Sequence, residues 1–242
     1  MGENSAIGWT DDTMNFWQGC TKISPGCKFC YMYRDKARYG QDPRTVVRSS
    51  DATFYAALAR DKTGAWKRTA GRRQFTNSWS DFFIPEADNW RDDAYGVIDA
   101  RPDLIWQVLT KRIDLVPGRL PATWGTGWPQ VHLGVSVENA AYTWRIDMLR
   151  ETPAALRFLS LEPLLGPLPN LDLRGIGWVI TGGESGADGE RRDCEVEWFD
   201  DIASQCDAAG VPLFVKQDSG RQPGQRGRIP ARLWRHEFPK AA

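Results

Sequence analysis

The sequence predicts an α/β fold, a partial (βα) barrel of the TIM type with six or seven parallel strands in a single domain. Short apolar segments alternate with segments of helical periodicity along most of the chain, which is typical of βα units and a parallel sheet. The apolar segments also run into polar or charged residues, and the carboxyl ends of strands in such barrels meet at the face where active sites lie. A chain of 242 residues is long enough for one such unit.

Hydrophobic periodicity and end signals place the individual elements. Gly40 marks the end of the first helix, and Ser50 and Asn139 are positioned to cap two later helices at their amino ends. The strands are expected at residues 14–17, 74–79, 104–109, 131–137, 157–161, 178–180 and 211–215, and the helices at 31–39, 51–60, 88–98, 140–149 and 194–209.

Charge is balanced over the whole chain but not along it. Lys+Arg and Asp+Glu both number 31, so net charge indicates neither a nucleic-acid nor a membrane partner. Residues 216–242 hold seven basic residues and two acidic ones, which marks 219–242 as a basic tail on a body formed by 1–218. No apolar run spans a bilayer and no signal peptide is recognised, so we expect a cytoplasmic protein without a membrane partner.

Three of the five cysteines lie close together. Cys20, Cys27 and Cys30 have C-x6-C-x2-C spacing, and Pro25 and Gly26 bend the chain between them. Three thiolates from one loop suit zinc or an iron–sulfur cluster, and a site with three protein ligands and one open position is typical of catalysis. A structural zinc site completed by His132 or Cys194 is the alternative interpretation.

An apolar strand that enters a three-cysteine loop, with Phe29 just before the last cysteine, resembles the cluster loop of radical S-adenosylmethionine (SAM) enzymes. The C-x6-C-x2-C variant resembles their phage Gp37/Gp68-type, three-Cys-motif branch, which is distantly similar to spore photoproduct lyase. The resemblance implies a 4Fe-4S cluster on the three cysteines with SAM at its open iron position, where reduction cleaves SAM to a 5′-deoxyadenosyl radical. It also implies that Phe29 lies against the adenine and that an external electron donor is needed.

Polar residues that follow the strands are the candidates for binding SAM. On two consecutive strands, Ser136 with Glu138 and Ser160 with Glu162 alternate onto one side, so these pairs are expected to face one cavity. Hydroxyl and carboxylate groups suit ribose and the amine of SAM, while Lys111, Arg112 and Lys216 suit its carboxylate or a substrate phosphate. The segments that also match the family pattern contain Asn77, Lys111, Ser136, Glu138, Ser160, Glu162 and Lys216.

A glycine turn late in the chain is a further candidate. Gly182 and Gly183 follow an apolar strand and allow the backbone to approach a ligand closely, and Glu184 offers a carboxylate to an ammonium group. Family members carry a G-G-E sequence that holds the methionyl amine, although theirs follows an early strand.

The two remaining cysteines are expected to differ. Cys206 falls on the apolar face of a helix and is interpreted as a buried core thiol. Cys194 follows two arginines and is expected at a helix start capped by Asp193, an environment that favours a thiolate. Because the photoproduct lyase uses a cysteine as hydrogen donor, the resemblance makes Cys194 a candidate catalytic residue.

The sequence therefore favours a radical SAM enzyme. A nucleic acid is the expected substrate, because basic residues at 67–73 and in the tail accompany twelve tryptophans. The alternatives are a zinc-stabilised nucleic-acid-binding module without catalysis, and an iron–sulfur protein that only senses or transfers electrons.

Overall fold

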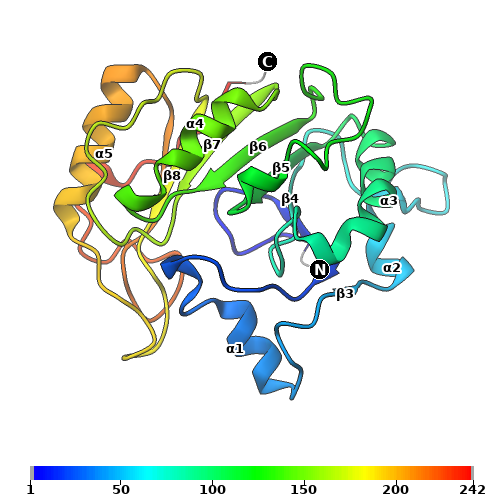
Figure 1. Ribbon diagram of the computed structural model, residues 1–242, viewed down its shortest axis with the longest axis horizontal. Helices are drawn as coiled ribbons and strands as arrows, with labels where there is room; N and C mark the ends of the chain where they lie inside the picture. The colour runs from blue at the N-terminus through cyan, green and yellow to red at the C-terminus, as the bar shows by residue number, and fades with distance from the viewer. Residues whose placement is uncertain (1–2, 241–242) are drawn as a thin grey trace.

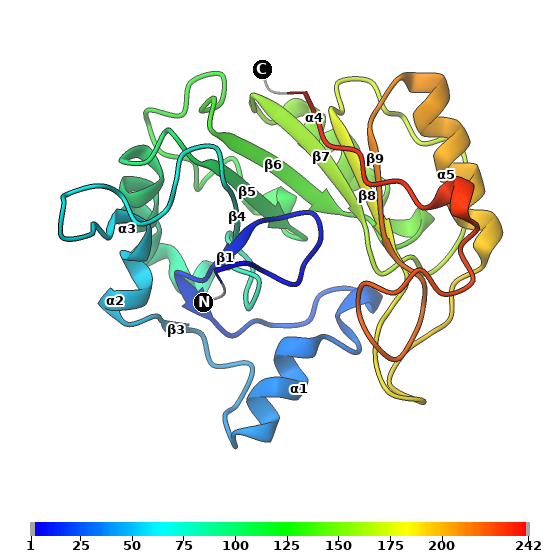
Figure 2. The same cartoon turned by 180° about the vertical axis from the view of Figure 1, so that it is seen from behind.

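The computed structural model describes residues 3–240 and contains a curled sheet of seven parallel strands, which forms a half-barrel (Figures 1 and 2). This confirms the predicted fold class. In sheet order the strands are β1 (Asp12–Met14), β4 (Arg73–Thr76), β5 (Ile105–Thr110), β6 (Val131–Ser136), β7 (Leu156–Leu161), β8 (Trp178–Gly182) and β9 (Leu213–Gln217).

Helices cover the outer, convex face of the sheet (Figure 1). The sheet contributes apolar side chains such as Leu133 and Val135, both fully buried, to the large core under the helices. One helix ends at Gly210, whose φ of +66° is the left-handed conformation that glycine adopts without strain. The covering helices are α3 (Asp88–Asp99), α4 (Trp144–Glu151) and α5 (Val196–Ala209).

The inner, concave face carries a second, smaller apolar cluster. Trp9 packs against Phe75, Phe158 and Trp178, with ring centroids 4.6, 6.3 and 6.3 Å away. Trp9 belongs to a segment that crosses this face near the start of β1 (Figure 2). The amino half of the inner face is thus lined mainly by aromatic rings, and the polar residues predicted to form the site lie toward the carboxyl ends of the strands.

The first predicted strand, 14–17, is two separate strands in the structure. The backbone N–H of Phe16 donates to the side chain of Asn77 (2.9 Å) and its carbonyl accepts from Ser49 (2.9 Å), so the chain leaves the main sheet there. It then pairs in an antiparallel two-stranded sheet. The two strands of this second sheet are β2 (Trp17–Gln18) and β3 (Val47–Arg48).

The predicted helix at 51–60 is also shorter than expected. Ser50 forms no capping hydrogen bond to the backbone, and the helix gives way to a 3-10 turn after one turn. Asn139, by contrast, does form a cap, because its side chain accepts from the N–H of Ala141. The segment that it caps is a 3-10 turn, and the helix predicted at 140–149 begins only at Trp144. The remaining elements are α1 (Tyr31–Arg38), α2 (Asp51–Phe54) and the 3-10 segments Pro25–Cys27, Ala56–Leu58, Pro85–Ala87, Ile113–Leu115, Ala140–Tyr142 and Ala231–Leu233.

The basic tail runs back along the edge strand β9. Val215 donates to the carbonyl of Arg235 (2.7 Å), and the indole of Trp178 donates to the carbonyl of Glu237 (2.8 Å). The tail therefore covers an edge that would otherwise expose unpaired backbone groups. Residues 241 and 242 of the predicted tail lie outside the described residues. Within residues 3–240, no helix has the length and apolar character that crossing a membrane requires.

Candidate functional site

The cysteine loop lies between β2 and α1, at the carboxyl edge of the half-barrel. Gly19 has a φ of +98°, and a β-carbon there would lie 2.1 Å from the carbonyl oxygen of Thr45, so only glycine allows this approach. The chain then turns inward, where the N–H of Cys20 donates to Pro43 (2.9 Å). Cys30 closes the loop as the residue that precedes α1.

The thiols of Cys20, Cys27 and Cys30 are half-buried and free of disulfides. Burial, followed by the nearby charge of Asp81, raises the pKa of Cys20 to about 12, and Cys27 contributes in the same direction at both other thiols. The charge of the Cys27 thiolate thus acts on both other thiols. Across residues 3–240, however, no three His, Cys, Asp or Glu side chains are close enough to hold a metal ion together. As a donor set, three neighbouring thiols still fit an iron–sulfur cluster.

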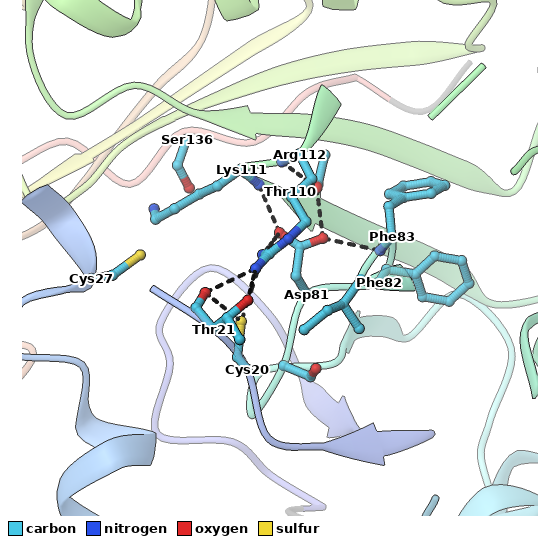
Figure 3. A network of polar contacts seen from close by, with 12 residues as sticks. Cys20, Thr21, Cys27, Asp81, Phe82, Phe83, Thr110, Lys111, Arg112 and Ser136 are labelled. Atoms are coloured by element: carbon cyan, nitrogen blue, oxygen red, sulfur yellow. Dashed lines mark hydrogen bonds and ion pairs between the residues drawn. The ribbon is translucent and has the colours of Figure 1, made fainter. Parts of the chain in front are cut away.

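Arg112 holds one end of the loop, as Figure 3 shows. Its buried guanidinium lies 3.6 Å from Cys20 Sγ and donates to both oxygens of Thr21 at 2.8 Å. Asp81, which accepts from Thr110 Oγ1 (2.7 Å), lies 3.3 Å behind the guanidinium. Although burial opposes it, this carboxylate keeps the pKa of Arg112 above its ordinary value. A permanent positive charge is therefore fixed beside the first cysteine.

Glu138 holds the middle of the loop. Its buried carboxylate accepts from Ser24 and forms ion pairs with Lys111 (3.2 Å) and Arg145 (3.0 Å). Burial alone would raise the pKa of Glu138, but Lys111 and the other donors hold it below its usual value. Gly26 fits against this carboxylate, because a β-carbon there would lie 2.5 Å from it. The predicted SAM-binding residues Glu138 and Lys111 are therefore engaged with each other and with the loop.

The pair formed by Glu184 and Arg192 holds the loop from the side of β8. The two oxygens of Glu184 accept from the Arg192 side chain at 2.7 and 2.9 Å, and the same guanidinium donates to the carbonyl of Pro25 (3.0 Å). Gly183 approaches the tail rather than an open space, since a β-carbon there would lie 2.3 Å from the nitrogen of Ser219. Gly182 makes only ordinary contacts. The carboxylate predicted to bind an amine is thus paired with an arginine.

Two serines leave free hydroxyls beneath the loop. Ser136 and Ser160 are register partners on β6 and β7, as expected for residues facing one cavity. No described residue hydrogen bonds to either hydroxyl, within the span 3–240 for which contacts are known. Asn77, buried with a φ of +56°, also has a side-chain N–H group without a partner in that span. These side chains therefore keep hydrogen-bonding capacity that no residue in this span uses.

A further pair closes the inner face beyond the serines. Lys216 on β9 forms an ion pair with Glu162 at the end of β7, and both side chains are partly buried. On the rim, Phe29 is half-buried between two cations, with the Lys28 ammonium 4.9 Å and the Arg192 guanidinium 5.4 Å from its ring. The predicted polar residues therefore gather at one edge of the sheet, and most of them are paired.

The prediction that Cys194 lies in an environment that favours a thiolate was wrong. Helix α5 begins at Val196 behind Glu195, not behind Asp193, and Cys194 is fully buried. Its sulfur accepts from Ser219 Oγ (3.2 Å), and burial raises rather than lowers the pKa of the thiol. Cys194 is therefore a protonated thiol in the core beneath the tail. Cys206 is fully buried on α5, which confirms that prediction.

His132 cannot complete the cysteine site. It lies near the start of β6, whereas the loop contacts Glu138 just beyond the end of that strand. Six residues of strand separate the two by about 20 Å. Burial lowers the pKa of His132 to about 4, so it is neutral in the wall of the inner face.

Several residues that hold the loop were not among the candidates. Asp81 follows a predicted strand, and the position of polar residues after apolar strands is the signal that indicates it. Arg112 was a candidate for the SAM carboxylate or a substrate phosphate, and in the structure it contacts the loop. Arg145 and Arg192 come from a helix and a loop, and their partners depend on tertiary folding alone.

The curled parallel sheet and the loop at its carboxyl edge define an α/β half-barrel protein with a three-cysteine loop. The family described as "Protein of unknown function (DUF5131)" matches residues 4–232, so the chain belongs to that family. No curated protein and no solved structure matches the chain.

Proposed function

We propose that this protein is a radical SAM enzyme that holds a 4Fe-4S cluster through Cys20, Cys27 and Cys30. The observation that carries the proposal is the position of the three free thiols, which lie in one loop held against the carboxyl ends of the strands. Active sites of parallel βα folds are built at this edge. Three ligands leave one iron without a protein donor, which is the position a cofactor needs.

When bound, the cluster would deliver an electron to SAM and so generate the 5′-deoxyadenosyl radical that abstracts hydrogen from a substrate. The chain's own residues position and enclose the site. Arg112 fixes Cys20, while Glu138 and the Glu184–Arg192 pair hold the loop at Ser24 and Pro25. These contacts anchor the loop at three points before any cofactor binds, which reduces the entropy lost on binding.

Ser136, Ser160 and Asn77 supply the unpaired polar groups with which SAM would be oriented. Their hydroxyl and amide groups suit the ribose and carboxylate oxygens of the cofactor. Glu162 and Lys216 pair across the inner face and would each need to exchange that partner for a ligand. The aromatic cluster around Trp9 fills the inner face beneath them and would keep water out of the site from that side.

Metal analysis of the full chain after anaerobic reconstitution tests the proposal. We expect about four irons per chain with a broad brown absorption, and a loss of that iron in Cys20→Ala, Cys27→Ala and Cys30→Ala. Cys206→Ala is the matched control, because that thiol is buried in α5 away from the loop, and it should keep the iron. One colourless zinc per chain would contradict the proposal and favour a zinc-stabilised binding module.

A further inference from the structure

The segment that carries the cysteine loop is strongly basic. Residues 20–48, here called the α1 arm, hold seven Lys and Arg residues and two Asp residues, a net charge of +5 in a chain whose total is zero. Both cartoon views show α1 projecting from the body below the carboxyl edge of the sheet (Figures 1 and 2). The α1 arm therefore presents positive charge beside the mouth of the half-barrel.

Five arginines of the basic regions that the sequence singled out are neutralised from within. These arginines form ion pairs with carboxylates of the body, and such pairs leave little charge for a phosphate. The pairs are Arg72 with Asp12, Arg73 with Asp11, Arg228 with Asp218, Arg232 with Asp200, and Arg235 with Asp207. The expected polyanion surface at 67–73 and in the tail thus has fewer available cations than its composition suggests.

In the α1 arm, Arg44 pairs with Asp42 and Arg48 pairs with Asp51, but the cations near the cysteine loop and on α1 lack such close partners. Lys22, Lys28 and Arg38 have no carboxylate within ion-pair distance in the described part of the chain, and Arg34 has only exposed Glu190, at 3.7 Å. Lys22 instead donates to the backbone carbonyl of Lys28 (2.7 Å). These charges are therefore free to bind an external anion.

The two arginines among these cations lie on the exposed side of α1. Tyr31, Arg34 and Arg38 lie three and four residues apart, so they share one exposed face, while Met32 and Lys36 are buried on the opposite face. Exposed aromatic rings accompany the charges: Tyr31 is 40% exposed and Tyr39 is 72% exposed. Cations interleaved with accessible rings are the features that bind single-stranded nucleic acid, whose bases can stack.

We propose that the α1 arm binds single-stranded nucleic acid, with Lys28, Arg34 and Arg38 on phosphates and Tyr39 stacked on a base. Because Lys28 lies between Cys27 and Cys30, a strand bound there passes beside the cysteine loop. The role of this strand as the substrate rests on the proposed function, whereas binding itself depends only on charge and exposed rings. A duplex would offer phosphates but would keep its bases stacked inside, so it fits the surface less well.

Fluorescence anisotropy with a labelled 20-nucleotide single strand, measured over a range of salt concentrations, tests this proposal. The full chain should bind with an affinity that falls as salt rises. In K28E/R34E/R38E the slope of log K against log salt should fall by about 2, with affinity at 0.1 M salt about a hundredfold lower. Tyr39→Ser should weaken binding by about fivefold or more and leave the slope unchanged.

K62E/R221E/R226E is the matched control. It removes three exposed cations that lie outside the α1 arm and changes net charge by the same amount. Its affinity should stay within about twofold of wild type. Thermal unfolding of all variants shows whether they fold.

Equal losses in both triple variants, or binding of a duplex as tightly as a single strand, would overturn the inference. The outcome is separable from that of the proposed function. A chain that retains four irons but binds no strand refutes the surface alone, whereas strand binding without iron refutes the enzyme alone.

Discussion

Arg112 Nη1 lies 3.6 Å from the sulfur of Cys20 and 3.3 Å from the carboxylate of Asp81. The side chain is buried, so its charge is weakly screened by solvent. An arginine in this position neutralises negative charge that accumulates on the sulfur, and its partner Asp81 prevents it from turning away. This relationship ties the carboxyl end of β5 to the first cysteine of the loop.

Replacing Arg112 should change the reduction potential of the bound cluster. In Arg112→Gln the positive charge and an N–H donor to sulfur are lost, and the reduced, more negative state loses stabilisation. We expect the midpoint potential to become more negative by roughly tens of millivolts. Potentiometric titration followed by electron paramagnetic resonance measures it. Arg221→Gln, an exposed tail position, is the control, and an equal shift in both variants would refute a local effect.

Removing Asp81 should destabilise the fold. Asp81→Ala leaves Arg112 buried without its carboxylate and removes the acceptor for Thr110 and for the N–H of Phe83. We expect a loss of about 3–5 kcal/mol in the free energy of unfolding, measured by urea denaturation. Asp92→Ala on the exposed side of α3 should change it by less than about 0.5 kcal/mol. A loss at Asp81 as small as this would show that the network contributes little.

Gly26 should be intolerant of a side chain. In Gly26→Ala the new methyl group would meet the carboxylate of Glu138 at 2.5 Å, so the loop must move away from its anchor. We expect a cost of about 1–3 kcal/mol and reduced iron retention, measured by denaturation and by metal analysis. Gly96→Ala, where nothing lies within 4 Å on α3, should instead be neutral or slightly stabilising. Similar results at both glycines would show that the Glu138 contact does not constrain the loop.

Asp12 should make the fold sensitive to acid. Burial alone would raise the pKa of this carboxyl, but hydrogen bonds from Arg72 and Gln74 lower it from 3.8 to about 2. A folded-state pKa below the unfolded one stabilises the protein above pH 4, by about 2 kcal/mol, and this stabilisation is lost as pH falls toward 2.

Unfolding free energies of wild type and Asp12→Asn, measured from pH 7 to pH 3, check this pH dependence. The variant should be less stable at pH 7, and the difference should narrow by about half near pH 3. A difference that stays constant over this range would contradict the assignment. Asp92→Asn should follow wild type throughout.

The fold was predictable from sequence because its signals are local. Apolar segments such as β6 and β7 alternate with helical patterns, and periodicity of two correctly placed Ser136 and Ser160 on one face. The break between β1 and β2 was not predictable, because it depends on the side chain of Asn77, which is 61 residues away from Phe16. The side chain of Asn77 competes with strand pairing for the backbone of Phe16, and local periodicity does not indicate such a distant contact.

The site was predictable in its residue types but not in its pairings. Strand-end residues do gather around the cysteine loop, yet Glu138 and Glu184 are bound by Arg145 and Arg192, and no local pattern marks these arginines as their partners. Cys194 shows the same limit, because burial beneath Ser219 of the tail determines its pKa and no local pattern reports that burial.

The central claim is that the cysteine loop holds a cluster whose open iron binds SAM. The most direct test is to incubate the reconstituted full chain with SAM and dithionite under anaerobic conditions and to quantify methionine and 5′-deoxyadenosine. We predict that both products form in equal amounts and that neither forms in Cys27→Ala. A protein that binds four irons and leaves SAM intact when reduced would contradict the claim and would identify an iron–sulfur protein that only transfers or senses electrons.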